Sequence, residues 1–279
     1  MNKTLSLLLL CATILPAAAP VLVHGHRGAR SSRPENTIPA FEFAIQAGAD
    51  VLELDVAVTK DNVLVVSHDP KMNLEICQGP PGPVIIRQMT LEELRRWDCG
   101  SKKNKAFPDQ VPVPGARVPT LDEVLGLANR GAFHFNIETK SFPKNPEYTP
   151  PPEEFARLMA AAIRKHKLEA RSIVQSFDYR TLHAMRKIAP EIRLSALEMN
   201  RTVSFVELAK EAGAGIVSPH FKLVTPEKVA EAHRAGLQVV PWTANTAAEW
   251  DRLIAAGVDA IITDDPAGLI AHLKKRGLR

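Results

Sequence analysis

The 279-residue chain lacks the features that mark several special classes of protein. It has three cysteines, aromatic residues make up only 5% of it, and neither charge sign dominates, since 35 Lys and Arg stand against 31 Asp and Glu. A net charge of +4 is too small to indicate a nucleic-acid partner, although it allows a local basic pocket for an anionic substrate. No repeat or low-complexity tract is evident. The 45% of hydrophobic residues is typical of a globular protein, and the length suits one barrel domain.

The chain also lacks a hydrophobic run long enough to span a bilayer. Its most apolar stretch, Leu5 to Leu15, follows Lys3 and precedes the small residues Pro16–Ala19. A charged start, a short apolar core and an A-x-A site are typical of a secretory signal peptide. We therefore predict a signal peptide at 1–19, a protein that is exported (periplasmic or secreted), and no stable membrane span. A buried first strand or an uncleaved anchor is the alternative.

Cysteine usage agrees with export. Cys11 would leave with the signal peptide, so the mature chain would keep an even pair, Cys77 and Cys99. In an oxidising compartment these two residues would form a disulfide. The alternative is two unpaired thiols.

Eight short apolar runs alternate with amphipathic stretches, which favours a parallel α/β fold. The runs are 20–25, 50–55, 133–138, 172–176, 192–197, 215–219, 237–242 and 259–263. They predict a (β/α)8 TIM barrel over residues 20–279. Thr120 and Glu123 form a capping-box pattern before one helix, and Asn36 is expected to cap the helix that runs to Gly48.

The apolar run 63–67 does not fit the alternation. Only Lys60-Asp61-Asn62 separates it from the strand that ends near Thr59, and a parallel crossover needs many more residues. We therefore expect a β-hairpin extension that brings His68 beside Glu53 and Asp55. The following segment, about 70–118, is rich in proline and glycine, and we interpret it as an insertion over the C-terminal face of the barrel.

Carboxylates gather at the ends of the predicted strands. Glu53 and Asp55 are two residues apart and so point to the same face, and Glu138 ends the next parallel strand. Three converging carboxylates repel each other without a cation, and oxygen ligands select a hard one, so we predict a site for one divalent cation, Ca²⁺ or Mg²⁺. The alternative is a metal-free network in which Arg27 and Lys140 neutralise the acids.

Two histidines and two cations complete the candidate site. His26 and His68 each adjoin a charged residue at a strand end, and a histidine pair can serve as general acid and base. Arg27 has the planar fork that suits phosphate oxygens, and Lys140 can add positive charge to the transition state. For both Arg27 and Lys140, the alternative is a purely structural role as salt-bridge partners of the carboxylates. The combination suggests hydrolysis of a phosphate ester.

Other residues of the same kinds are assigned to structure. His24, His134 and His220 are expected to be barrel or rim residues with hydrogen-bond partners. Trp242 ends the seventh strand and is a candidate for contact with the substrate's alcohol moiety, with a core role as the alternative. Glu35 has a site role and a structural role as equal alternatives.

The ordered set of motifs from residue 26 to about residue 266 resembles the glycerophosphodiester phosphodiesterase family. In chain order the matching residues are His26-Arg27-Gly28-Ala29, Pro34-Glu35-Asn36-Thr37, Glu53-Leu54-Asp55, Thr59-Lys60-Asp61, Val65-Val66-Ser67-His68-Asp69, Pro119-Thr120-Leu121-Asp122-Glu123, Asn136-Ile137-Glu138-Thr139-Lys140, Ser176-Phe177, Trp242-Thr243-Ala244-Asn245 and Ile262-Thr263-Asp264. Any one of them would be a weak signal, whereas the ordered set is specific.

The resemblance implies a function. Its substrates would be deacylated phospholipids such as glycerophosphocholine or glycerophosphoethanolamine, which yield glycerol 3-phosphate and an alcohol. The family's metal ligands match Glu53, Asp55 and Glu138, and its catalytic histidines match His26 and His68. The nucleophile would be water or the substrate's own 2-hydroxyl.

Two rival functions follow from the same residues. A lysophospholipase D or phospholipase C-like enzyme would need an apolar groove for an intact lipid, which Val84-Ile85-Ile86 in the insertion is a candidate to supply. A non-catalytic glycerophosphodiester-binding protein is the rival of another class, but it would not need both histidines beside three carboxylates.

Overall fold

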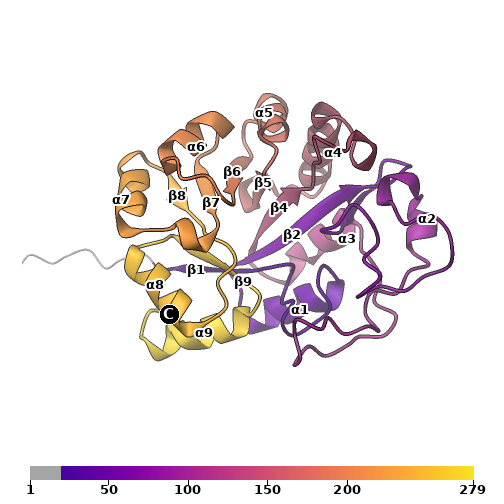
Figure 1. Ribbon diagram of the computed structural model, residues 1–279, viewed down its shortest axis with the longest axis horizontal. Coiled ribbons are helices and arrows are strands. Elements are labelled where there is room, and N and C mark those ends of the chain that lie inside the picture. The colour runs from indigo at the N-terminus through magenta and orange to yellow at the C-terminus, as the bar shows by residue number, and fades with distance from the viewer. Residues whose placement is uncertain (1–19) are drawn as a thin grey trace, which may run out of the picture.

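The computed structural model describes residues 20–279, and the predicted signal peptide at 1–19 lies outside them. Within this range the strands form a parallel barrel surrounded by helices, as the alternation of runs predicts (Figure 1). The parallel strands are β1 (Leu22–Gly25), β2 (Val51–Val58), β4 (His134–Thr139), β5 (Ser172–Ser176), β6 (Arg193–Glu198), β7 (Ile216–Pro219), β8 (Gln238–Val239) and β9 (Ala260–Thr263). Their order is β8-β7-β6-β5-β4-β2-β1-β9.

The barrel is nearly closed between β8 and β9. The Asp259 N–H donates to the Val239 carbonyl at 3.1 Å, and the Ile262 N–H donates to the Pro241 carbonyl at 2.9 Å. The run 237–242 was expected to be one strand, but β8 covers only two residues of it. Pro219 and Pro241 lack an N–H, which leaves the β7–β8 ladder incomplete here, although the Trp242 N–H still reaches the Pro219 carbonyl at 3.1 Å.

The helices cover the outside of the barrel (Figure 1). They are α1 (Ile38–Ala47), α2 (Leu91–Leu94), α3 (Leu121–Leu125), α4 (Pro152–Lys165), α5 (Tyr179–Ile188), α6 (Phe205–Ala212), α7 (Pro226–Arg234), α8 (Ala247–Ala256) and α9 (Pro266–Lys275). The predicted capping box is present at α3, where the Thr120 side chain accepts from the Glu123 N–H and the Glu123 carboxylate accepts from the Thr120 N–H.

The prediction that Asn36 caps α1 is wrong. Thr37 occupies the N-cap position without a side-chain cap, and Pro39 lies in the first turn, where a missing N–H costs little. Asn36 has a left-handed φ of 55° and turns its amide inward, where it donates to the Asp55 carboxylate at 2.9 Å. The asparagine therefore belongs to the interior of the site.

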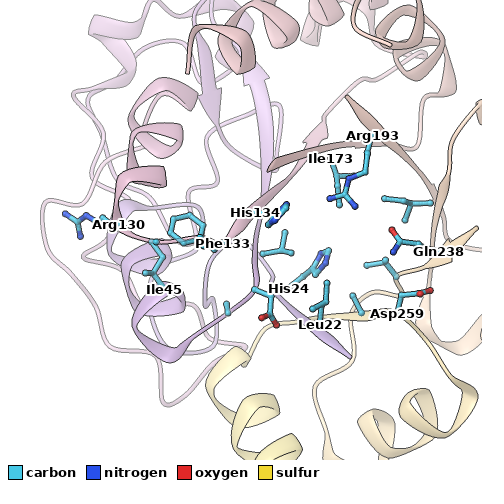
Figure 2. A pocket seen from close by; sticks show the side chains of 18 residues that line it. Leu22, His24, Ile45, Arg130, Phe133, His134, Ile173, Arg193, Gln238 and Asp259 are labelled. Carbon is cyan, nitrogen blue, oxygen red and sulfur yellow. The ribbon is translucent and has the colours of Figure 1, made fainter. Parts of the chain in front are cut away.

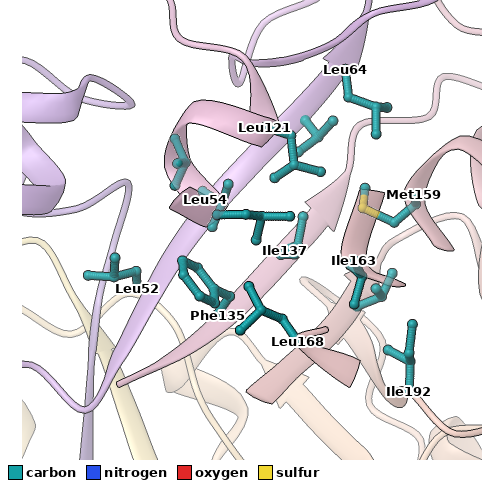
Figure 3. Packing of buried hydrophobic residues seen from close by; sticks show 14 of the residues in the cluster. Leu52, Leu54, Leu64, Leu121, Phe135, Ile137, Met159, Ile163, Leu168 and Ile192 are labelled. Atoms are coloured by element: carbon teal, nitrogen blue, oxygen red, sulfur yellow. The ribbon is translucent and has the colours of Figure 1, made fainter. Parts of the chain in front are cut away.

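The hydrophobic core lies between the outer face of the strands and the helices (Figure 3). Leu52 and Leu54 on β2 and Phe135 and Ile137 on β4 are fully buried there. Because side chains alternate along a strand, the intervening residues of β2 and β4 point to the barrel interior. The packing of the helices thus fixes which face Glu53, Asp55 and Glu138 occupy.

The predicted hairpin is confirmed. β3 (Leu64–Val66) pairs antiparallel with the far end of β2, with Val56 opposite Val66. The Ser67 N–H donates to the Asp55 carbonyl at 3.0 Å, so the chain that leaves the hairpin runs past the carboxylates. His68 follows at once.

The segment 70–118 contains no barrel strand, as expected, and has a small core of its own. Cys77 and Cys99 form a disulfide with an S–S distance of 2.07 Å, which confirms the predicted pair. Ile86, Leu94 and Trp97 are buried in the same cluster. Of the apolar run Val84-Ile85-Ile86, Ile86 is buried in this cluster, and Val84 is half-buried and packs against it.

Across residues 20–279, every helix is too short or too polar to cross a bilayer.

Candidate active site

A cavity of about 400 Å³ opens at the carboxyl ends of the strands. His26 and Arg27 follow β1, Glu53 and Asp55 lie on β2, and Glu138 is near the end of β4. His68, Lys140 and Trp242 also line the cavity. The structure therefore brings all eight predicted site residues to one place, at the carboxyl ends of the strands, where the active sites of TIM barrels lie.

The three predicted metal ligands converge. One carboxylate oxygen from each of Glu53, Asp55 and Glu138 can be chosen so that all lie within 4.8 Å of one another, and the three residues are buried. A Ca²⁺ ion holds its oxygen ligands at about 2.3–2.6 Å, so oxygens of one shell can be up to about 5 Å apart. The spacing fits a single ion.

Each carboxylate is held by neighbouring donors. Glu53 accepts from the Arg27 N–H at 2.9 Å and from the Gln175 amide at 2.8 Å. Glu138 accepts from Lys140 Nζ at 2.7 Å. Besides the Asn36 amide, Asp55 has Arg27 Nε at 3.2 Å and Lys140 Nζ at 3.8 Å. Donors of this kind orient metal-binding carboxylates.

The electrostatics of the three acids differ. Burial, followed by the charge of Asp55, raises the pKa of Glu53 well above its usual value. Burial also raises the pKa of Glu138, against the opposing charge of Lys140. Burial acts the same way on Asp55, but the positive charges of Arg27, His68 and Lys140 outweigh it and lower its pKa. The cluster therefore holds charge that its own cations neutralise only in part.

Counting the buried charges shows the imbalance. The carboxylates of this region are Glu35, Glu53, Asp55, Glu138 and Asp264, whereas the Lys and Arg side chains paired with them are Arg27, Arg30 and Lys140. Glu53 has no Lys or Arg side chain within 4.0 Å among residues 20–279, and its nearest basic group is His26 Nε2 at 3.9 Å. The carboxylates therefore outnumber the Lys and Arg side chains around the cavity, even before Asp69 beside His68 is counted, and a divalent cation would offset this excess of acid. The residues present therefore fit such an ion.

His26 is fixed by a carboxylate behind its ring. Its Nδ1 lies 2.5 Å from Asp264 Oδ1, and Asn245 holds Asp264 by donating its amide to Oδ2 at 2.7 Å. Nε2 is left on the side of Glu53. Burial lowers the pKa of His26, and Asp264 opposes that shift only in part. The ring is thus oriented and neutral, as a general base requires.

His68 has a similar partner at a more open position. Its Nδ1 lies 2.7 Å from Asp69 Oδ1, and Asn73 donates its amide to Asp69 Oδ2 at 3.2 Å. The side chain of His68 is 37% exposed, against 11% for His26. The two histidines therefore share one device, an aspartate on Nδ1, but differ in their access to solvent.

Arg27 lines the cavity and belongs to a chain of ion pairs with Glu35 and Arg30. Its Nη1 lies 2.6 Å from Glu35 Oε1, and the other Glu35 oxygen is 2.8 Å from Arg30 Nη2. The backbone of Arg27 is left-handed, with a φ of 49°, which aims its own N–H at Glu53 and its side chain along the cavity wall. Glu35, whose role the sequence left undecided, is thus a partner of two site arginines.

The side of the cavity away from the carboxylates is apolar. Trp242 meets Phe177 edge to face with 5.5 Å between ring centroids, and its indole N–H donates to the Ser218 carbonyl at 2.9 Å. Phe177 and Met199 also line the cavity and are 42% and 47% exposed. The site therefore joins a charged half to an apolar half.

Sequence reasoning gave no site role to Asp264, Asn36 and Gln175, although the first two lie in motifs that carry the family resemblance. Asp264 directly follows β9 and Gln175 lies near the end of β5, so the rule that found Glu138 was available for both. Asn36 gave no such signal, because its contact with Asp55 depends on a left-handed turn.

Comparison with known proteins agrees with this geometry. Residues 26–268 match the model of the glycerophosphoryl diester phosphodiesterase family. The chain belongs to this family. It is accordingly an enzyme of the phosphoric diester hydrolase class.

Individual relatives cover nearly the whole chain. A glycerophosphodiester phosphodiesterase of Caldanaerobacter subterraneus subsp. tengcongensis is 36% identical over 92% of this chain and 99% of its own length. A Bacillus subtilis enzyme of the same name is 33% identical over 92% of this chain and 87% of its own. A crystal structure of a Silicibacter pomeroyi protein named for this family superposes with a TM-score of 0.87, at 34% identity, over 94% of this chain and 95% of that one.

Proposed function

We propose that this family member hydrolyses glycerophosphodiesters, such as glycerophosphocholine or glycerophosphoethanolamine, to glycerol 3-phosphate and the free alcohol, with one divalent cation as cofactor. The observation that carries the proposal is the convergence of three buried carboxylates and two aspartate-paired histidines on one cavity. That set combines a hard-metal site with two proton-transfer groups.

Glu53, Asp55 and Glu138 would hold the cation, either Ca²⁺ or Mg²⁺. A bound ion of this kind polarises a phosphoryl oxygen and stabilises a developing alkoxide. Gln175, Asn36 and the Arg27 N–H keep the carboxylates in position.

His26 and His68 would move the protons. The Asp264 contact at Nδ1 leaves Nε2 of His26 free to accept a proton from the attacking hydroxyl, whether that belongs to water or to the substrate's glycerol. His68, which also lines the cavity, would then donate a proton to the leaving alkoxide. Asp69 would hold the His68 ring in position for this role.

Arg27 and Lys140 would bind the phosphate. Both line the cavity, and each already contacts a carboxylate, so the substrate's anion would compete for a cation that is oriented in advance. Trp242 would contact the alcohol moiety together with Phe177. The charged half of the cavity would thus bind the phosphate, and the apolar half would bind the alcohol moiety.

The exposed apolar side chains favour a second candidate function. Phe177 and Met199 lie at the cavity in contact with solvent, where an acyl chain of a lysophospholipid would cover them. The same metal site and histidines would then act as a lysophospholipase D.

We also propose export, with the signal peptide at 1–19 and the barrel beginning at residue 20. The Cys77–Cys99 disulfide supports it, because such bonds persist in oxidising compartments. Amino-terminal sequencing of protein recovered outside the cytoplasm tests it: a start near residue 20 agrees, and an intact Met1 contradicts it.

The proposed reaction is tested by measuring glycerol 3-phosphate released from glycerophosphocholine, in parallel with choline released from lysophosphatidylcholine. Faster turnover of glycerophosphocholine supports the first function, and faster turnover of lysophosphatidylcholine supports the second. Turnover of neither substrate with either cation present contradicts both.

A further inference from the structure

A second and larger cavity, of about 560 Å³, lies at the opposite end of the barrel (Figure 2). Its lining comes from the first residues of the strands, among them Leu22 of β1, His134 of β4 and Arg193 of β6. The volume lies within the range of about 300–1,000 Å³ that is typical of small-molecule sites. Nothing in the proposed reaction uses this end.

An apolar cluster forms the floor of this amino-end cavity. Ile173, Ile216, Val240 and Ala260 line the cavity and pack together with Ile262, which in turn lines the catalytic cavity. One apolar cluster inside the barrel therefore lies between the two cavities and lines both. A ligand on this floor would need a compact apolar part.

The charges at the rim leave one cation without a partner. Asp50 is bound by Arg279 at 2.7 Å, and Asp259 accepts from the Val239 N–H at 2.7 Å and contacts His233 at 3.0 Å. Arg130, the other lining arginine, pairs with Glu42 at 2.7 Å. Arg193, which lines the cavity and is exposed to solvent, has no carboxylate within 4.0 Å and no hydrogen-bond acceptor among residues 20–279, and no neighbouring acid raises its pKa.

Two histidines lie beside Arg193. Figure 2 shows the side chains of Arg193, His134 and His24, from three different strands, around the same space. Nδ1 of His134 is buried and has no hydrogen-bond partner within residues 20–279. Burial lowers the pKa of His24 to about 3 and also lowers that of His134, so both rings are neutral and offer N–H donors without added charge.

We infer that the amino-end cavity is a second binding site, which takes a small organic anion with a compact apolar body. The anionic group would pair with Arg193 and accept from His134, and the apolar part would cover Ile173, Ile216 and Val240. A carboxylate and a phosphate monoester share this chemistry. The inference is independent of the proposed reaction, since no residue of the catalytic cavity takes part.

Calorimetric titration of the purified protein with hexanoate, butyl phosphate and inorganic phosphate tests the inference. Hexanoate or butyl phosphate is expected to bind more tightly than inorganic phosphate, which lacks an apolar body, and Arg193→Gln is expected to weaken that binding at least about tenfold, as loss of a charge-assisted hydrogen bond does. Hexanoate binding would identify a carboxylate ligand, and butyl phosphate binding a phosphate monoester. The matched control is Arg234→Gln, which removes the same charge from an exposed position outside the cavity and should leave binding unchanged.

A second, steric variant keeps the inference testable if Arg193→Gln does not fold. Circular dichroism would reveal such misfolding. Gln238 is exposed at the mouth of the cavity, and Gln238→Trp should block it and abolish the same binding while Arg193 remains. Failure of all three anions to bind, or equal binding by wild type, Arg193→Gln and Gln238→Trp, would overturn the inference. Binding that only Arg27→Gln weakens would place the anion in the catalytic cavity and would also overturn it.

Discussion

Two histidines line the cavity at each end of the barrel, but the residues that contact them differ. At the carboxyl ends, His26 and His68 lie against Asp264 and Asp69 at 2.5 and 2.7 Å. At the amino ends, His24 and His134 have no carboxylate within 4.0 Å among the residues described. His24 lies on β1 and His26 directly follows that strand, so only two positions along the chain separate a residue of one cavity from a residue of the other.

The difference shows that a histidine's role is set by its partners more than by its strand. An aspartate on Nδ1 fixes the ring and stabilises its protonated form, which makes proton transfer possible. Without that partner, burial keeps the ring neutral, as it does for His24. The following variants remove a histidine or a neighbouring side chain at one end, and most are compared with a control variant at the other end.

Removal of the catalytic ring itself should have the largest effect. His26→Ala is expected to lower kcat/KM for glycerophosphocholine about 10³-fold, within the range for loss of a general base. His134→Ala removes a ring from the amino end and should retain the wild-type rate. Similar losses in both variants would show that position in the barrel does not separate the two pairs.

Loss of the aspartate behind the ring should come next. Asp264→Asn keeps the shape but no longer stabilises the correct form of His26, so kcat should fall about 10²-fold with KM unchanged. The matched control is Asp259→Asn, which alters an Asp–His pair at the amino end. If the loss appeared in KM, or as a lower Tm, Asp264 would have a different role.

A smaller effect is expected from the donor behind Glu53. Gln175→Ala removes the 2.8 Å hydrogen bond to that carboxylate and should weaken Ca²⁺ or Mg²⁺ binding about 10-fold in calorimetry. Ser172→Ala, at the amino end of the same strand, serves as the control. Unchanged cation affinity in Gln175→Ala would remove Glu53 from the metal site.

The last prediction concerns stability rather than catalysis and comes from the amino end. His24 has a pKa of about 3 in the folded chain and about 6.5 when unfolded, so below pH 6.5 the unfolded state binds a proton that the folded state does not. Stability should therefore fall with pH by about 1.4 kcal/mol per unit between about pH 6 and 4.

Urea unfolding of wild type and His24→Asn at several pH values measures that slope. The variant should lose stability less steeply over the same interval because it lacks the titrating group, whatever its stability at neutral pH. Parallel curves for the two proteins would mean that His24 is not kept neutral by the fold.

The sequence was sufficient to predict the barrel, the hairpin and the convergence of the carboxylates. Each depends on local patterns, since period-two alternation places Glu53 and Asp55 on one face, and the short connection 59–63 forces β3 to turn back. Asp264 was within reach of the same reasoning.

Other features depend on information that is not local. The left-handed turns at Arg27 and Asn36, with φ of 49° and 55°, direct a backbone N–H and an amide at the carboxylates. Asparagine adopts this conformation more readily than most residues, but arginine has no such preference, and neither residue type shows where its donor will point. The amino-end cavity depends on the combined size of side chains that begin eight different strands. Such a volume becomes visible only when the barrel is assembled.

The most direct test of the account is a titration that follows cation binding and turnover together. Metal-free protein, prepared with EDTA, is titrated with Ca²⁺ or Mg²⁺ while glycerol 3-phosphate release from glycerophosphocholine is measured, for wild type and for Glu138→Gln. The account predicts one bound cation per chain, activity that rises in proportion to its occupancy, and loss of both in the variant. Full activity in EDTA, or a bound cation that Glu138→Gln does not affect, would contradict it.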